Sequence, residues 1–303
     1  MSASSFKNAE VAEKLERFRS VYIPYPVHTD FQNRCDYLQQ LGVRTRGKAQ
    51  MGMRVLAPTG SGKTTAADHY IQVVERRRPK SPTLVPVVKV NLERASTSKK
   101  LMISILDQFG DPFSTHGNEL ILKRRVFACF QRFSTELLFV DEIQHLNARA
   151  GGVGGDVTDT LKGLLDGGLV PMVFMGTEDA RSLFTRNLQL NGRLLAPCDF
   201  APLRVTSRTD RVLFAGFVSR LERVLVDEGI LPELSSLGEE GFVPALFEVS
   251  KGVIGRVARL FQAALEIAIR RGARRIEAID LAEAIDRWAI PQGFIDQNPI
   301  RRS

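Results

Sequence analysis

The sequence predicts an α/β fold, with a parallel β-sheet flanked by helices, followed by a small all-helical domain. Three observations support this. Short apolar stretches that read as strands alternate with helical segments in the first two thirds of the chain, as in parallel sheets covered on both faces. A glycine-rich turn separates the first strand from the helix that follows it. From Thr209 onward only helical periodicity remains.

The elements are expected in a regular order. Strands are predicted at 53–57, 85–90, 137–140 and 170–175, with a last strand near 199–203. Helices are predicted after the glycine-rich turn and at 101–109 and 119–133. We therefore divide the 303 residues into four parts: an N-terminal helical and extended segment at 1–45, an α/β domain at 46–205, a helical lid domain at 206–290 and a flexible tail at 291–303.

Composition narrows the function classes. The formal net charge of +8 favours polyanionic partners, although basic charge alone is weak support. The three cysteines and four histidines show no zinc-binding spacing, so we expect reduced thiols. The N-terminus has no apolar signal-peptide core, and no stretch approaches the roughly 18 apolar residues of a membrane helix. We expect a soluble cytoplasmic protein that does not contact a membrane.

The strongest functional signal is the glycine-rich turn, which predicts a phosphate-binding P-loop. Small residues let successive N–H groups face phosphates, and the helix N-terminus adds its dipole. Lys63 would reach the β- and γ-phosphates of ATP, and the Thr64 hydroxyl would hold Mg²⁺. The first glycine of the usual pattern is Ala57, at a position that only shapes the turn. The predicted nucleotide-binding residues here are Gly60, Ser61, Gly62, Lys63, Thr64 and Thr65.

A second signal is the acidic pair that ends the third predicted strand, typical of a Walker B segment. Asp141 would ligate Mg²⁺ through water, and Glu142 would polarise the attacking water as general base. Taken alone, two acids after a strand are equally typical of a solvated strand end. Following a P-loop, they predict a nucleotide hydrolase.

Weaker signals indicate a P-loop NTPase of the AAA+ type. Thr177 follows the fourth strand, where AAA+ proteins place a polar sensor of the γ-phosphate, although a threonine before acids is also ordinary helix capping. Arg193 and Arg186 precede the last strand and could supply an arginine finger to a neighbouring subunit. Arg193 is the preferred candidate. Either finger requires a homo-oligomer.

At this point the chain resembles the TniB/TnsC family of transposon-encoded AAA+ ATPases, which is related to the IstB and MuB transposition proteins. The resemblance covers about residues 20–290. It rests on YIPYP at 22–26 and VDEIQHL at 140–146, which are supported by segments at 161–165, 171–177, 192–194, 231–234 and 250–256.

The resemblance implies a role in DNA transposition. Members of the family bind ATP, assemble into rings or filaments on duplex DNA, and recruit a DDE transposase to target DNA. Other transposon-encoded partners and a nucleoid location are implied as well. By position Arg193 matches the residue that acts in trans. Arg256 falls near the second sensor, but the G-x-x-R spacing from Gly252 ends at Gly255, so either the register is shifted or this sensor is missing.

The resemblance also indicates where DNA would bind. In relatives, basic residues just after the second strand face the DNA, and here this region and the next helix supply Lys99, Lys100, Lys123 and Arg124. Phosphate contacts need charge and no base-reading geometry, so little sequence specificity is expected. Each of these residues is also compatible with an ordinary solvated helix face.

Two other functions share the same core. One is a DNA-translocating motor or helicase loader. The other is a nucleotide-dependent signalling switch that binds a protein and no nucleic acid. ATP-dependent sedimentation with duplex DNA separates the switch from the other two, and a strand-displacement assay identifies a motor.

Overall fold

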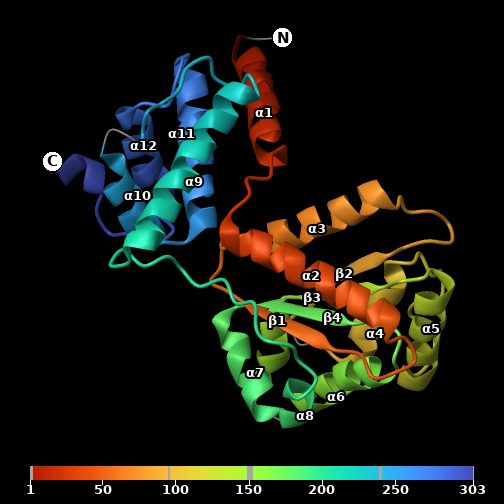
Figure 1. Ribbon diagram of the computed structural model, residues 1–303. Coiled ribbons are helices and arrows are strands. Elements are labelled where there is room, and N and C mark those ends of the chain that lie inside the picture. The colour runs from red at the N-terminus through yellow and green to blue at the C-terminus, as the bar shows by residue number, and fades with distance from the viewer. Residues whose placement is uncertain (1–2, 95, 149–152, 239–240, 303) are drawn as a thin grey trace. The chain divides into compact units, whose positions relative to one another are not determined.

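The computed structural model describes residues 3–94, 96–148, 153–238 and 241–302. Among these residues four strands form a parallel sheet in the order β1-β4-β3-β2 (Figure 1). The strands are β1 (Gly52–Leu56), β2 (Val87–Asn91), β3 (Leu137–Asp141) and β4 (Met172–Gly176). Each lies within two residues of its predicted position, which confirms the parallel α/β prediction.

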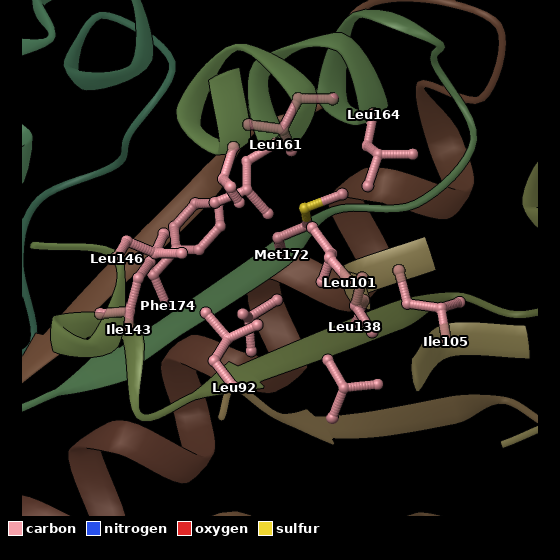
Figure 2. Packing of buried hydrophobic residues seen from close by; sticks show 14 of the residues in the cluster. Leu92, Leu101, Ile105, Leu138, Ile143, Leu146, Leu161, Leu164, Met172 and Phe174 are labelled. Atoms are coloured by element: carbon pink, nitrogen blue, oxygen red, sulfur yellow. The ribbon is translucent and has the colours of Figure 1, made fainter. Parts of the chain in front are cut away.

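Helices cover both faces of this sheet, because alternate residues of each strand point to opposite faces. Leu137 and Phe139 of β3 pack with α2 (Pro26–Arg44) and α3 (Lys63–Arg77). Leu138 and Val140 pack on the other face. Figure 2 shows part of this cluster, with Leu138 labelled. The helices there are α4 (Ser98–Asp107), α5 (Glu119–Arg132), α6 (Val153–Asp166), α7 (Arg181–Arg186) and α8 (Leu188–Asn191).

The predicted last strand is present only as an irregular extended segment. Leu195, Cys198 and Phe200 donate backbone hydrogen bonds to Gly52, Arg54 and Leu56 of β1, at 2.8, 2.9 and 2.9 Å. Regular pairing would require donors at every second residue, but Pro197 has no N–H. The segment therefore carries one extra residue between its first two bonds, and the expected strand at 199–203 is wrong in both regularity and position.

The chain divides into two compact units. One contains residues 26–59 and 63–200 and holds the sheet with its helices; the other contains residues 1–25, 60–62 and 201–303. This clustering splits the N-terminal segment that we predicted at 1–45. The helix α1 (Ala3–Ser20) groups with the C-terminal helices, whereas α2 lies on the sheet. The break falls at 21–25, where Pro24 and the following Pro26 prevent one continuous helix.

The second unit is helical. It comprises α9 (Arg208–Asp227), α10 (Phe242–Ser250), α11 (Ile254–Arg271) and α12 (Ala278–Ala284), with a π-helical turn at Ile285–Ala289. Ser207 caps α9 by accepting the Asp210 N–H, and Gly272 ends α11 in the left-handed region. In α1, Val11 and Phe18 are buried, and Arg17 donates to the Glu228 carbonyl at 3.1 Å.

Some of the residues predicted to form a flexible tail contact other parts of this unit. Asn298 Nδ2 donates to the Ala282 carbonyl at 2.8 Å and to Asp286 at 2.7 Å. Arg301 and Arg302 in the short helix Pro299–Arg302 pair with Asp286 and Glu248. These contacts of Asn298, Arg301 and Arg302 join residues far apart in the chain and leave no local sequence pattern, and a flexible tail at 291–303 stays a prediction. Within the described ranges, no helix has the length and apolar character needed to span a membrane.

Candidate nucleotide-binding site

Within the unit that holds the sheet, Lys63, Thr64, Asp141 and Thr177 lie at the carboxyl edge of the sheet. The P-loop follows β1, Asp141 ends β3 and Thr177 follows β4. Leu56 pairs with Gly176 and Val140 pairs with Phe174, so the three strand ends lie side by side. Ligands of open parallel sheets bind at this edge.

The P-loop backbone explains its glycines. Gly60 and Gly62 have φ values of +80° and +87°, in the left-handed region that glycine adopts without steric cost. Ala57 does not have a positive φ; its N–H donates to the Gly176 carbonyl at 3.1 Å. Alanine in place of the first glycine therefore carries no backbone penalty.

Lys63 begins α3 and is almost fully buried. Its Nζ donates to the Ala57 carbonyl at 3.1 Å across the turn. Burial lowers the pKa of the ammonium, and the carboxylates of Asp141, Glu142 and Glu178 oppose this shift. A buried cation with one carbonyl partner retains donors for an anionic ligand.

Thr64 and Asp141 are joined directly. Thr64 Oγ1 donates to Asp141 Oδ2 at 2.9 Å, and the Glu142 N–H donates to Oδ1 at 2.8 Å. Asp141 is 1% exposed, and burial raises the pKa of its carboxyl group. A hydroxyl and a carboxylate at this spacing are the hard oxygen donors that Mg²⁺ prefers, so the residues present fit the metal.

Glu142 has an unusual backbone conformation for its type. Its φ is +59°, in the left-handed region that non-glycine residues rarely occupy and that clusters at functional sites. Its carboxylate Oε2 accepts a hydrogen bond from Gln144 Nε2. Gln144 lies in the short 3₁₀ helix Ile143–Ala148.

Gln144 also reaches β4. Its Oε1 accepts the Thr177 N–H at 3.1 Å, so one amide connects Glu142 with Thr177. Sequence reasoning did not single out Gln144, because a glutamine two residues after an acid carries no signal of its own. The Thr177 hydroxyl donates to Asp179 Oδ2 at 3.1 Å and makes no capping hydrogen bond to the short helix that follows, so the sensor role stays a prediction and the capping alternative gains no support.

Arg193 lies at the edge of the sheet formed by the amino-terminal ends of the strands, opposite the P-loop. Its carbonyl accepts the N–H of Gly52, the first residue of β1, whereas the P-loop follows the last. From Gly52 to Ala57, where the P-loop begins, the chain advances five residues at about 3.3 Å each, or roughly 16 Å. The Arg193 guanidinium pairs with Asp166 at 2.5 Å and donates to the Gln189 carbonyl at 3.0 Å. Arg186 is exposed at the end of α7.

Arg256 lies in the first turn of α11, in the helical unit. Its guanidinium stands 4.6 Å from the centre of the Phe294 ring, and burial lowers its pKa. Gly60, which groups with this unit, lies against Gly255: a Cβ there would be 2.0 Å from the Gly60 carbonyl oxygen. Glycine is thus required where the G-x-x-R spacing expects arginine. A sensing role for Arg256 stays a prediction.

The four basic residues predicted to contact DNA lie on two neighbouring helices. Thr160 Oγ1 donates to Ser98 Oγ at 2.8 Å and to Glu119 Oε1 at 3.3 Å, so the first residues of α4 and α5 meet at this hydroxyl. Lys99 and Lys100 follow Ser98 directly, and both are exposed. Lys100 forms a long 3.8 Å ion pair with exposed Glu93.

The α5 residues differ from one another. Arg124 is exposed, whereas Lys123 is half-buried with its Nζ 5.9 Å from the centre of the Phe127 ring. A Cβ on Gly163 of α6 would lie 2.7 Å from this Nζ. Lys123 therefore packs along the protein surface, and Lys99, Lys100 and Arg124 present their charges to solvent.

Comparisons with known proteins agree with this architecture. Residues 18–198 match the family model described as Bacterial TniB protein. A comparison with curated protein sequences finds no match. Among solved structures, the ORC2 protein of Aeropyrum pernix in ADPNP–ADP complexes is similar with a TM-score of 0.64 at 13% identity, over 89% of this chain and 71% of that one.

Two further structures contain DNA. The ORC1 protein of Aeropyrum pernix in complex with DNA has a TM-score of 0.61 at 18% identity, over 88% of this chain and 66% of that one. Drosophila ORC bound to DNA has a TM-score of 0.54 at 18% identity, over 91% of this chain and 65% of that one. The chain thus spans slightly less than two thirds of the length of these two. The similarities confirm the AAA+ fold: a parallel α/β domain followed by helices.

Proposed function

The chain belongs to the bacterial TniB protein family, and on that premise we propose that it is an ATPase that assembles on duplex DNA. In this proposal the ATP-bound assembly selects target DNA and recruits a DDE transposase in DNA transposition. It works in the cytoplasm, at the nucleoid. The observation that carries the proposal is the convergence of Lys63, Thr64, Asp141 and Glu142 at one sheet edge.

Each side chain has a role in ATP hydrolysis. Lys63 contacts the β- and γ-phosphates, and the P-loop N–H groups surround them. Thr64 and Asp141 would hold Mg²⁺, which neutralises phosphate charge when bound. Glu142 polarises the attacking water. Thr177 senses the γ-phosphate.

The position of Arg193 supports a homo-oligomer. About 16 Å of strand separates its backbone from the P-loop of its own subunit, so it serves the nucleotide of a neighbouring subunit as an arginine finger. ATP at the subunit boundary then stabilises the assembly. This explains why assembly requires ATP in the proposal.

Binding to DNA is supported by charge and by position. Lys99, Lys100 and Arg124 expose their charges near the N-termini of α4 and α5, and helix N-termini also attract anions. Proteins of the same fold have been solved with DNA. The contacts suit phosphates, so DNA of any sequence is the ligand.

Sedimentation tests the proposal. The full chain is centrifuged with labelled duplex DNA under three conditions: a non-hydrolysable ATP analogue, ADP, and no nucleotide. We expect a fast-sedimenting DNA complex only with the analogue, and none with the Lys63→Ala variant. A chain that sediments as a monomer in all conditions contradicts the proposal, and strand displacement by the wild type would identify a motor instead.

The transposase partner requires its own test. DNA loaded with the ATP-bound assembly is incubated with a purified DDE transposase, and DNA-bound transposase is measured. We expect retention above that of naked DNA, and loss of the excess with Lys63→Ala. Equal retention of the transposase on naked DNA would contradict transposase recruitment and would not affect the proposal that the chain is an ATPase.

A further inference from the structure

Gln144 connects two parts of the site that sequence motifs treat separately. Its Nε2 donates to Glu142 Oε2, and its Oε1 accepts the Thr177 N–H at 3.1 Å. We propose that Gln144 is a positioning residue, which holds the Glu142 carboxylate and couples it to the end of β4. This inference rests on the proposed ATP hydrolysis.

The surroundings of Gln144 restrict where its amide can lie. Ile143 and Leu146 are buried, and His145 Nδ1 lies 2.7 Å from the Leu92 carbonyl oxygen, so the short helix is fixed on both sides of Gln144. On β4, a Cβ at Gly176 would lie 2.7 Å from Gln144 Oε1. Glycine is therefore needed at 176 for the amide to reach the Thr177 N–H.

The Gln144 amide, which forms a bridge between Glu142 and Thr177, helps to hold Glu142 in its unusual backbone conformation. A glutamate at φ +59° has no strong local preference for that conformation, so other contacts must hold it. Three hold this residue: its N–H donates to Asp141 Oδ1, its carbonyl accepts the His145 N–H at 3.0 Å, and its Oε2 accepts from Gln144 Nε2. The first two fix the backbone, and the bond from Gln144 fixes the carboxylate. In the proposed mechanism, the other carboxylate oxygen would polarise the attacking water.

The bridge has a regulatory consequence. Thr177 is the candidate γ-phosphate sensor, and its backbone N–H holds the Gln144 amide. A γ-phosphate that draws the Thr177 segment toward it also moves the amide, and with it Glu142. The water-polarising group is thereby set by the presence of the γ-phosphate.

The test compares Gln144→Met with wild type. Methionine keeps the length of the side chain and removes both hydrogen bonds. We expect kcat for ATP hydrolysis to fall about tenfold, the size of one hydrogen bond to a charged group expressed as a rate, with the Kd for ATP and the Tm unchanged. The control is Gln72→Met, at an exposed position of α3, which should match wild type.

A double-mutant comparison isolates the path through Glu142. In a Glu142→Gln background, Gln144→Met should cause no further loss of kcat, since the group that it positions is gone. Gly176→Ala would place a Cβ 2.7 Å from Gln144 Oε1 and 2.8 Å from Ile143 Cγ2, so it should lower kcat in wild type. A kcat for Gln144→Met within twofold of wild type, or above it, overturns the inference, as does a full additional loss in the Glu142→Gln background.

Failure of the inference differs from failure of the proposed function. If the chain is no ATPase, wild type itself shows no hydrolysis with or without DNA. If only the inference fails, wild type hydrolyses ATP and Gln144→Met does so equally well.

Discussion

Arg193 Nε lies 2.5 Å from Asp166 Oδ1, within one subunit and at the sheet edge opposite the P-loop. Both side chains are about one third exposed, so the pair contributes little to stability, on the order of 0.2–1 kcal/mol. A neighbouring subunit that brings a nucleotide to this edge therefore competes with a weak bond. In the proposed assembly, Asp166 would hold Arg193 in place until the γ-phosphate of a neighbouring subunit replaces it.

The first prediction concerns this finger. Arg193→Ala should leave ATP binding by the isolated subunit intact and lower DNA-stimulated hydrolysis by about 10³-fold, in the range of arginine-finger losses. Mixing it with Lys63→Ala subunits should partly restore hydrolysis, because each variant supplies what the other lacks. The measurement is phosphate release against mixing ratio.

Asp166→Asn is the matched control for that prediction. It removes the carboxylate charge that holds Arg193 and leaves the finger itself, so DNA-stimulated hydrolysis should equal or exceed that of wild type. Unchanged hydrolysis by Arg193→Ala, with no effect of mixing, would show that Arg193 is not the arginine finger. Arg186 would then be the remaining candidate, or the chain would have no such finger.

The second prediction separates ATP binding from turnover. Glu142→Gln keeps the shape of the side chain and both oxygen ligands on Thr64 and Asp141, but removes the base. It should bind ATP, assemble on DNA and hydrolyse ATP slowly, so its complexes should outlast those of wild type in a DNA dissociation assay. Undiminished ATP turnover by Glu142→Gln would show that a group other than Glu142 polarises the attacking water.

Lys63→Ala should instead abolish ATP binding, because it deletes the buried point charge.

The third prediction tests the packing of the helical unit. Gly252 and Gly272 have nearly equal φ values, +73° and +74°, but only Gly252 is enclosed: a Cβ there would lie 2.0 Å from the Leu203 carbonyl oxygen. Gly272→Ala should lower the free energy of unfolding by about 1–2 kcal/mol, the left-handed backbone cost. Gly252→Ala adds a clash and should cost clearly more. Chemical denaturation of both variants measures the difference, and equal costs would show that Leu203 moves freely.

The success of sequence reasoning follows the range of the interactions involved. Strand positions, the P-loop and the Asp141–Glu142 pair are set by residues adjacent in the chain, and apolar periodicity reveals them. Even the irregular last strand has a local cause, Pro197, which could have been weighed as a missing donor.

Contacts between distant segments left no such pattern. The bond from Thr177 to Gln144 spans 33 residues, and that from Arg17 to Glu228 spans 211. Neither the bridge at Glu142 nor the grouping of α1 with the C-terminal helices could be inferred without knowing which elements meet. The same holds for Asp166, an ordinary acid until α6 brings it to Arg193.

The last prediction concerns DNA, and its control is a matched charge change elsewhere. Lys99→Ala with Lys100→Ala removes two exposed charges at the start of α4, whereas Arg76→Ala with Arg77→Ala removes two exposed charges at the end of α3. Both variants lose the same net charge. A difference between them therefore reports position and not overall electrostatic attraction.

Binding to duplex DNA should require ATP, weaken steeply with salt and show almost no preference for sequence. A monomer with a few phosphate contacts binds DNA only with a Kd of about 10⁻⁴–10⁻⁶ M at physiological salt, whereas an ATP-linked array repeats those contacts along the duplex. The Lys99 and Lys100 variant should weaken binding equally for all duplexes and reduce the salt slope by about one per lost contact. The Arg76 and Arg77 variant should keep the wild-type slope. Fluorescence anisotropy over a salt series with ATP, ADP and no nucleotide measures the affinity and the salt slope of both variants. Tight binding without ATP, or a strong preference for one duplex, would contradict target capture and would indicate a conventional DNA-binding regulator.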